Sequence, residues 1–284
     1  MAQVIQLFSN PHAGGYSRGR VQALVRALQD SGATVVQSFS ADAPPEILDG
    51  VDHVCVAGGD GTVRHVASAV LRCGRPVTMS IYPVGTVNLL ARERLYPAVP
   101  HDFARMLTTE AETKPHFPVT AGEHFFFACA SVGPDSVALA RHSPRLKRLI
   151  GKAAYVIAFL SLLLRWPRPR LRLDIDGDIL PCEAFYVAKG RYYAGNWSFA
   201  PTCRADDPLM HVIALERAGR LDFARLMLAL VLRRDVSALR GVRCFSVTSL
   251  AAESDVPVPL QADGDIVAHL PVRLSIGDRP LSFR

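Results

Sequence analysis

The chain has 284 residues, 49% hydrophobic and 20% charged, which is enough for one large or two ordinary domains with sizeable cores and excludes a disordered protein. Its net charge of +6 arises entirely after residue 114: the first 114 residues carry ten basic and ten acidic side chains, and the rest carry 22 and 16. The second part is therefore expected to face an anionic surface, such as a membrane.

Nucleic acid is not an expected partner, because RNP-like aromatic motifs, zinc-finger spacings and basic tails are all missing from the sequence. The residues from Met1 to Ile5 lack the basic and apolar pattern of an export signal, and six scattered cysteines without a Cys-x-x-Cys pair are typical of a reducing compartment. We therefore expect a cytoplasmic protein. The longest apolar stretch, Leu149 to Leu164, is interrupted by Lys152 and falls short of the roughly 20 residues that span a bilayer.

The first elements in chain order are strands and helices in alternation. Residues 4–8 predict a strand, and a glycine-bearing loop over residues 9–15 follows it. Apolar residues at helical spacing over 21–28 predict a helix that Gly32 ends. Residues 34–36 predict another strand, and the prolines at 44 and 45 predict the start of a short helix.

The central stretch is an apolar run over residues 54–57, Gly58-Gly59-Asp60-Gly61-Thr62, and a helical pattern from Val63. The run predicts a strand buried on both faces, and Thr62 is expected to cap the helix. Unpaired amides at such a turn favour a phosphate, and Asp60 is tolerated there if a divalent cation lies between the two anions. The turn therefore indicates a nucleotide-plus-metal site; the alternative is an ordinary strand-to-helix turn.

A fourth strand, predicted over residues 77–82, ends in Pro83-Val84-Gly85-Thr86-Val87-Asn88 before another helical pattern. Three strands thus each end in a glycine-containing loop that leads into a helix. In an open parallel sheet such loops gather at the carboxyl ends of the strands, where ligands bind. This convergence is stronger support for a ligand site than any one loop.

The pattern changes near Lys114 to alternating strands joined by turns, which predicts an antiparallel β domain. Asp176-Gly177 predicts a hairpin turn rather than part of a calcium loop. Helical insertions are expected over 145–164 and from 221 to about 239. The strands are predicted over residues 124–130, 171–175, 184–188, 210–215 and 244–248.

Basic residues flank the apolar stretch from Leu149 to Leu164. Two interpretations stay open: a solvated rim around a core helix, or a peripheral contact with anionic lipid headgroups, which Trp166 fits slightly better. The basic residues are Arg141, Arg145, Lys147, Arg148, Arg165, Arg168, Arg170 and Arg172.

Taken in order, four motifs resemble those of the diacylglycerol kinase catalytic domain family, which includes bacterial lipid kinases and sphingosine kinases. The motifs are Asn10-Pro11 with Gly14, Gly58 to Thr62, Pro83 to Arg92, and Gln261-Ala262-Asp263-Gly264-Asp265. Weaker landmarks at residues 151–155 and 200–207 extend the resemblance over nearly the whole chain.

The resemblance implies two domains. Residues 1–120 would form a Rossmann-like α/β nucleotide domain similar to phosphofructokinase and NAD kinase, and residues 121–284 an antiparallel β-sandwich that helps to bind lipid. Residues 272–276 could return to the first domain. ATP would lie in the cleft and contact Asn10, Pro11, Gly58, Gly59, Asp60, Gly61, Thr62, Gly85, Thr86 and Asn88.

The implied activity is that of an ATP-dependent transferase of phospholipid biosynthesis at the membrane surface, with a lipid alcohol as acceptor. Phosphoryl transfer needs charge neutralisation and a proton acceptor, for which the resemblance suggests Mg²⁺ with Asp60 and the base Asp263. Asp263-Gly264 by itself predicts only a hairpin turn. Asp265 would orient the metal or support Asp263. Asp206 and Asp207 resemble an acidic pair that holds a structural magnesium in some members, unless they form a solvated turn.

The sequence departs from the family at several positions. Leu89 stands where many bacterial members have Asp, Arg64 and His65 replace Asn and Glu, Asp265 shortens a Glu, and Pro208 replaces a Gly. The departures indicate a retuned site or reduced activity. Two alternatives stay open. An NAD kinase-like enzyme would share the Gly-Gly-Asp-Gly turn, and Leu89 motivates a non-catalytic nucleotide- or lipid-binding regulator.

Overall fold

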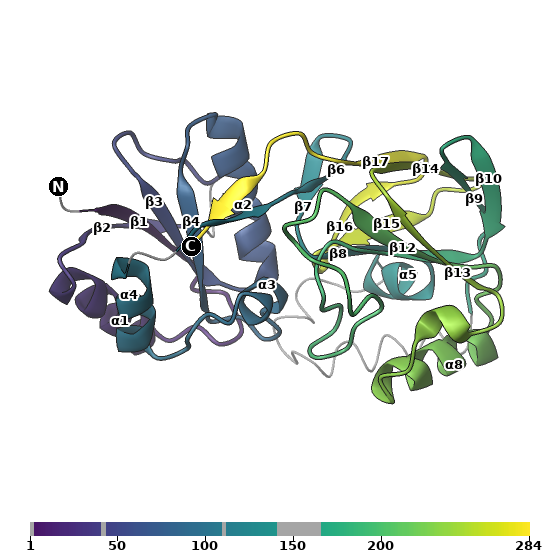
Figure 1. Ribbon diagram of the computed structural model, residues 1–284, viewed down its shortest axis with the longest axis horizontal. Helices are drawn as coiled ribbons and strands as arrows, with labels where there is room; N and C mark the ends of the chain where they lie inside the picture. Colours follow the sequence, from purple (N-terminus) through teal and green to yellow (C-terminus); the bar gives the residue numbers. More distant parts are fainter. Residues whose placement is uncertain (1–2, 41–43, 110–111, 141–165) are drawn as a thin grey trace. The chain divides into compact units, whose positions relative to one another are not determined.

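The computed structural model describes residues 3–40, 44–109, 112–140 and 166–284 (Figure 1). The chain divides into two compact units. Unit 1 comprises Met1–Phe117 and Asp278–Arg284, and unit 2 comprises Pro118–Gly277.

The described part of unit 1 is an α/β layer built on one six-stranded sheet, sheet A, in the order β2-β1-β3-β4-β18-β5. All neighbouring strands are parallel except the pair β18 and β5. The strands are β1 (Val4–Ser9), β2 (Thr34–Phe39), β3 (His53–Gly58), β4 (Thr78–Pro83), β5 (Lys114–His116) and β18 (Leu281–Phe283). The helices are α1 (Arg18–Asp30), α2 (Asp60–Cys73), α3 (Leu89–Glu93) and α4 (Pro100–Thr108).

The central strand β3 is buried at every residue, as its continuous apolar run predicts. Two local predictions in unit 1 are wrong. Residues 44–50 form no helix, because a proline disfavours the helical conformation in the residue before it. Thr62 lies inside α2, whose N-cap is the extended residue Gly59, because the helix already begins at Asp60.

The described part of unit 2 is a β-sandwich of two six-stranded antiparallel sheets. Sheet B has the order β10-β9-β14-β17-β6-β7, and sheet C has the order β13-β12-β11-β8-β15-β16. Apolar side chains from both sheets form the buried core between them. The strands of sheet B are β6 (Val119–Ala121), β7 (His124–Phe126), β9 (Leu171–Ile175), β10 (Asp178–Cys182), β14 (Ser249–Ser254) and β17 (Val272–Ile276). Those of sheet C are β8 (Cys129–Val132), β11 (Ala184–Ala188), β12 (Met210–Leu215), β13 (Val242–Val247), β15 (Pro259–Ala262) and β16 (Asp265–His269).

Helical segments pack on sheet C at its outer face. They are α5 (Pro134–Ala140), α8 (Arg220–Val231) and the short 3-10 helix η1 (Val236–Ala238). A second apolar cluster joins Tyr186 and Ile213 of the sheet to Phe223 and Leu226 of α8. Sheet C therefore has apolar contacts on both faces, unlike a sheet with one solvated side.

Three predictions for unit 2 need correction. The strand expected over residues 124–130 is broken into β7 and β8, because the amides of Phe127 and Ala128 donate to the carboxylate of Asp263. The strand β17 stays in sheet B, and it is β18 that pairs with β4 in unit 1. The helix α8 ends at Val231, because Arg233 adopts a left-handed conformation (φ 53°) and the amides of Arg233 and Arg234 turn back onto carbonyls of its last turn.

One further expectation is confirmed, and another falls outside the described residues. The Asp176-Gly177 hairpin joins β9 to β10 with positive φ at both residues. The helix expected over residues 145–164 lies outside the described residues. Within the described part, all six cysteines are free thiols and no helix is long and apolar enough to cross a bilayer.

Candidate active site

The loops after β1, β3 and β4 touch one another in unit 1. The amide of Gly15 donates to the carbonyl of Val84 (3.0 Å), which ties the first loop to the third. A Cβ atom on Gly15 would lie 2.7 Å from that carbonyl, and one on Gly85 would overlap the Cα atom of Gly59. These glycines therefore serve the close approach of backbone to backbone, and the predicted convergence of the three loops is confirmed.

Asn10 joins the first loop to the second. Its Nδ2 atom donates to the Oγ1 atom of Thr62 (3.0 Å), and its Oδ1 atom accepts from the amide of His12 (2.8 Å). The Thr62 side chain also fills the space beside Gly58, where a Cβ atom would lie 2.6 Å away. Asn10, Gly58 and Thr62 thus fix the shape of the turn, and Pro11 lies exposed next to it.

Asn88 closes the third loop on itself. Its side chain accepts from the amide of Gly85 and donates to the carbonyl of the same residue, both at 2.8 Å. Asn88 has a left-handed backbone (φ 54°), which asparagine tolerates better than most residues. Thr86 contacts the first loop, since a Cβ atom on Gly14 would lie 2.7 Å from its Oγ1 atom.

The turn leads into the 14-residue helix α2, which begins at Asp60. Gly59 is the N-cap and no side-chain cap bond is found among the described residues, so the first amides of α2 and its dipole favour an anion at this end. The half-buried Asp60 accepts a long hydrogen bond from the amide of Leu90 (3.4 Å). A phosphate fits this cradle, and one carboxylate with phosphate oxygens is the usual donor set for Mg²⁺.

Of the five positions that depart from the family motifs, Arg64 and Leu89 are buried, Asp265 is half-buried, and His65 and Pro208 are exposed. Leu89 begins α3 and Arg64 lies in α2, each less than a tenth exposed. A guanidinium nitrogen of Arg64 lies 3.4 Å from the Nε2 atom of His65. Sequence reasoning missed Arg20 of α1, which donates to the carbonyl of Pro83 (3.3 Å) and brings a cation to the third loop.

In unit 2, Asp263 is a buried carboxylate held by backbone amides. Its oxygens accept from the amides of Phe127, Ala128 and Cys129 at 2.8, 2.9 and 3.0 Å, and its own amide donates to the carbonyl of Cys129 (2.9 Å). These amides lie where β7 ends and β8 begins. The strand breaks here because the amides bind the carboxylate and not a neighbouring strand. Three such donors fix the orientation of the Asp263 carboxylate.

Asp263 and Gly264 form the two-residue turn between β15 and β16, with φ values of 47° and 90°. The hairpin expected from the dipeptide alone is confirmed. The turn aims the Asp263 side chain inward, and Asp265 begins β16. Asp60 and Asp263 belong to different units, so their meeting in one cleft stays a prediction.

The acidic pair Asp206 and Asp207 lies in the loop before β12. The carboxylate of Asp206 pairs with the guanidinium of Arg204 through contacts of 3.0 and 2.8 Å. Across the described residues, no group of three or more His, Cys, Asp or Glu side chains is arranged to hold a metal ion.

Sequence reasoning missed a buried polar cluster on the outer face of sheet C. Asp135 of α5 accepts from the hydroxyls of Ser131 (2.6 Å) and Tyr193, and Ser131 also lies 2.9 Å from the side-chain oxygen of Gln261. Burial raises the pKa of Asp135. Within the described part of the chain, its Oδ1 atom and the hydroxyl of Tyr186 have no hydrogen-bond partner.

The cluster is near Asp263 along the chain, because Gln261 lies two residues before it on β15. One proton on Asp135 would let Ser131 donate to Gln261, which agrees with the raised pKa. In the sequence, Ser131 and Asp135 are polar residues four positions apart in a largely apolar stretch. This pattern alone does not show that their side chains are buried together.

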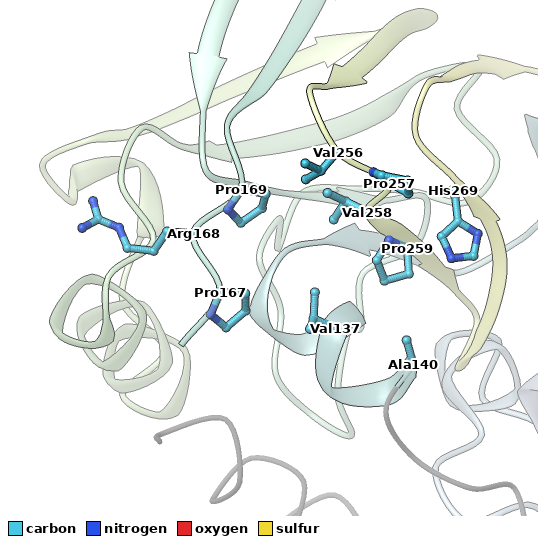
Figure 2. Close-up of a pocket in the computed structure, with 10 residues that line it drawn as sticks. All are labelled: Val137, Ala140, Pro167, Arg168, Pro169, Val256, Pro257, Val258, Pro259 and His269. Atoms are coloured by element: carbon cyan, nitrogen blue, oxygen red, sulfur yellow. The ribbon is translucent and has the colours of Figure 1, made fainter. Parts of the chain in front are cut away.

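An apolar hollow of about 550 Å³ opens beside α5. Figure 2 shows Val137 and Ala140 of α5 on one side of it, with the prolines of two chain segments and His269 around the rest. Such a lining suits a hydrocarbon group better than a polar ligand. The proline-bearing segments are residues 167–169 and 256–259.

Comparison with known proteins identifies the family. Residues 5–116 match the diacylglycerol kinase catalytic domain, and residues 128–282 match the YegS C-terminal NAD kinase beta sandwich-like domain. The chain belongs to the YegS and diacylglycerol kinase family of lipid kinases. It is therefore an enzyme of the lipid kinase class, which confirms the resemblance drawn from the four motifs.

Two relatives and one solved structure resemble this lipid kinase. A probable lipid kinase YegS-like protein of Pseudomonas putida is 28% identical over 69% of this chain and 68% of its own length. A diacylglycerol kinase of Staphylococcus carnosus is 24% identical over 86% of this chain and 78% of its own. A crystal structure of a diacylglycerol kinase from Bacillus anthracis covers 99% of this lipid kinase and 96% of that chain, with 20% identity and a TM-score of 0.79, and so shares its fold.

Proposed function

We propose that this lipid kinase transfers the γ-phosphate of ATP to the hydroxyl group of a membrane lipid alcohol, such as diacylglycerol or a sphingoid base. The observation that carries the proposal is the contact of three glycine loops at the N-terminus of α2, where the Cα atom of Gly59 leaves no room for a side chain on Gly85. Backbone amides at such a site bind a phosphate chain without a clash.

The proposed roles in unit 1 are binding and charge neutralisation. The Gly58–Thr62 turn would hold the phosphates, Asn10 would lie on the nucleoside side, and Asp60 would meet Mg²⁺. When bound, Mg²⁺ would neutralise charge that develops on the transferred group. Arg20 would add a fixed positive charge at the third loop.

The proposed base is Asp263. The three amide hydrogen bonds fix its orientation, and a carboxylate held in place can take the proton of an alcohol. Asp135 would contact the polar end of the acceptor, because its Oδ1 atom lacks a partner among the described residues. The apolar hollow beside α5 would receive part of the lipid chain.

Helix α8 supports a peripheral contact with an anionic membrane. Its inner face carries the buried side chains of Phe223, Leu226, Ala229 and Leu230. The outer face exposes four large apolar side chains at spacings of seven, three and one residues, which places them together. They are Leu221 (72% exposed), Leu228 (57%), Val231 (51%) and Leu232 (50%).

Exposed arginines surround this apolar face of α8. Apolar side chains that enter the interface, ringed by cations that meet anionic headgroups, are typical of helices that lie on membranes. A membrane-bound acceptor also requires the enzyme to reach the bilayer. The arginines are Arg217, Arg220, Arg225, Arg233 and Arg234.

The test is incubation of purified protein with Mg²⁺, labelled ATP and vesicles that contain a panel of lipid alcohols. We expect one class of lipid to become labelled and Asp60→Ala to abolish the label. Labelled NADP formed from NAD would favour the NAD kinase alternative. Failure to label any lipid with any divalent metal would favour the non-catalytic regulator.

A further inference from the structure

A buried ammonium group occupies the centre of the loop that carries the acidic pair. Lys189 follows β11 directly and is 0% exposed. Its Nζ atom donates to the main-chain carbonyls of Asp207 (2.8 Å), Ala205 (2.9 Å) and Arg204 (3.3 Å). Three carbonyl oxygens of one loop therefore converge on one positive charge.

This arrangement has the geometry of a small cation site. Hard cations such as Mg²⁺ and Ca²⁺ take oxygen ligands, and main-chain carbonyls are common among them. An ammonium group has three N–H donors, and here three carbonyls face it. A buried charge is costly unless it is paired in this way, so the loop and Lys189 depend on each other.

The two carboxylates do not complete a metal site. Asp206 is turned to Arg204, with which it forms two hydrogen bonds. No metal-binding group of acidic, histidine or cysteine side chains exists among the described residues. The residues of the loop therefore fit an internal ammonium group and not the structural magnesium that the acidic pair suggests.

We propose that the Lys189 ammonium group takes the place of a metal ion in the Arg204–Asp207 loop, so that this loop folds without a divalent cation. Any requirement of this enzyme for Mg²⁺ then belongs to the nucleotide chemistry of unit 1. The proposal goes beyond the kinase activity and does not depend on it.

The test is thermal unfolding of the full chain in EDTA and in millimolar MgCl₂ or CaCl₂, on an Asp60→Ala background that removes the carboxylate proposed to meet Mg²⁺. We expect the parent protein to melt at the same temperature in all three buffers. Lys189→Met and Lys189→Asn should both melt several degrees lower in EDTA. Lys114→Met, which changes an exposed lysine on β5, is the matched control and should not shift the melting temperature.

The two Lys189 variants differ in their expected response to metal. A divalent cation should restore part of the lost stability in Lys189→Asn, whose short side chain leaves the carbonyls accessible. It should not restore Lys189→Met, whose longer apolar side chain fills the position. An unchanged melting temperature in both variants, or a Lys189→Asn protein that no cation stabilises, would overturn the proposal.

A second measurement needs no Lys189 variant and covers the case in which both fail to fold. Amide hydrogen exchange of residues 200–210 in the parent protein should be the same in EDTA and in MgCl₂. Protection that rises with MgCl₂ and is lost in Asp207→Asn would place a metal ion in the loop and refute the inference.

Discussion

Gly59 and Gly85 lie in backbone contact, so that a Cβ atom on Gly85 would overlap the Cα atom of Gly59 and reach the Oδ1 atom of Asn88 at 2.5 Å. The second and third loops of the proposed phosphate site can thus approach this closely only if position 85 is glycine. This contact joins segments 26 positions apart in the sequence.

Gly85→Ala should abolish nucleotide binding, because the added methyl group pushes the two loops apart. We expect a loss of kcat/KM for ATP of at least about 100-fold, as displacements of about 1 Å at a reacting site can cause. Titration with a fluorescent ATP analogue measures binding directly. Gly19→Ala is the matched control. A Cβ atom on Gly19 would lie 3.8 Å from the Oγ atom of Ser17, so activity should persist, and the stability of α1 should rise by up to about 1 kcal/mol.

Asp263→Asn should impair both catalysis and folding. An amide nitrogen cannot accept from the amides that surround Asp263, so we expect a loss of about 1–3 kcal/mol in the free energy of unfolding. If Asp263 is the base, kcat should fall by roughly 10²- to 10⁴-fold at temperatures where the variant is folded. Chemical denaturation and initial rates separate the two effects.

The control for Asp263→Asn is Asp176→Asn, which makes the same change in a hairpin with the same backbone conformation but an exposed side chain. It should leave stability and kcat unchanged. Full kcat in folded Asp263→Asn would exclude Asp263 as the base.

Asp135→Asn should separate stability from activity. The amide oxygen can still accept from Ser131 and Tyr193. The variant also no longer buries a carboxyl group, whose ionised form is disfavoured by burial. We expect an equal or higher melting temperature together with a loss of kcat/KM for the lipid of about tenfold or more. The exposed Asp178→Asn is the control, and parallel losses of stability and activity in Asp135→Asn would make Asp135 purely structural.

His53 should make unit 1 less stable in mild acid. Burial, followed by the charge of Arg284, lowers the pKa of His53 from 6.5 to about 3, so its imidazole stays neutral between Thr78 and Ser80. Between these pH values the unfolded chain binds a proton that the folded chain does not. Stability should therefore fall as pH falls below 6.5, by up to about 1.4 kcal/mol per pH unit.

Melting temperatures measured from about pH 4.5 to about pH 7.5 test this contribution, because in the acidic part of this range only the unfolded chain protonates His53. His53→Gln, which keeps hydrogen-bonding groups but does not titrate, should show a shallower decline than the unchanged protein. His101→Gln, at an exposed histidine, should not alter the slope. An identical slope in His53→Gln would contradict the prediction.

The outer face of α8 should govern binding to anionic vesicles. Leu228→Glu with Leu232→Glu should abolish co-sedimentation with vesicles rich in phosphatidylglycerol. Arg233→Gln and Arg234→Gln should each weaken it by about 1 kcal/mol, roughly fivefold. Ile179→Glu, at an equally exposed apolar residue of β10, should bind as before.

Two other outcomes would contradict the membrane assignment of α8. Undiminished co-sedimentation of the double glutamate variant would show that another surface binds the membrane. If the unchanged protein is a dimer in solution and the variant a monomer, the face is an interface between copies of this chain.

The sequence by itself determined the elements whose signals are local. The buried run of β3, the glycine turn after it and the Asp176-Gly177 hairpin follow from hydrophobic pattern and backbone freedom over a few residues. The residues and the order of four motifs were enough to indicate the family, because together they resemble its motifs along nearly the whole chain.

Only the tertiary structure decided which polar groups are buried together. Asp263 breaks a strand more than 130 residues away by binding its amides, and Lys189 fills a loop that its acidic residues marked as a metal site. Asp135 became a candidate only through contacts with Tyr193 and Ser131. A buried charge is defined by partners brought from distant parts of the chain, and local sequence carries no signal for them.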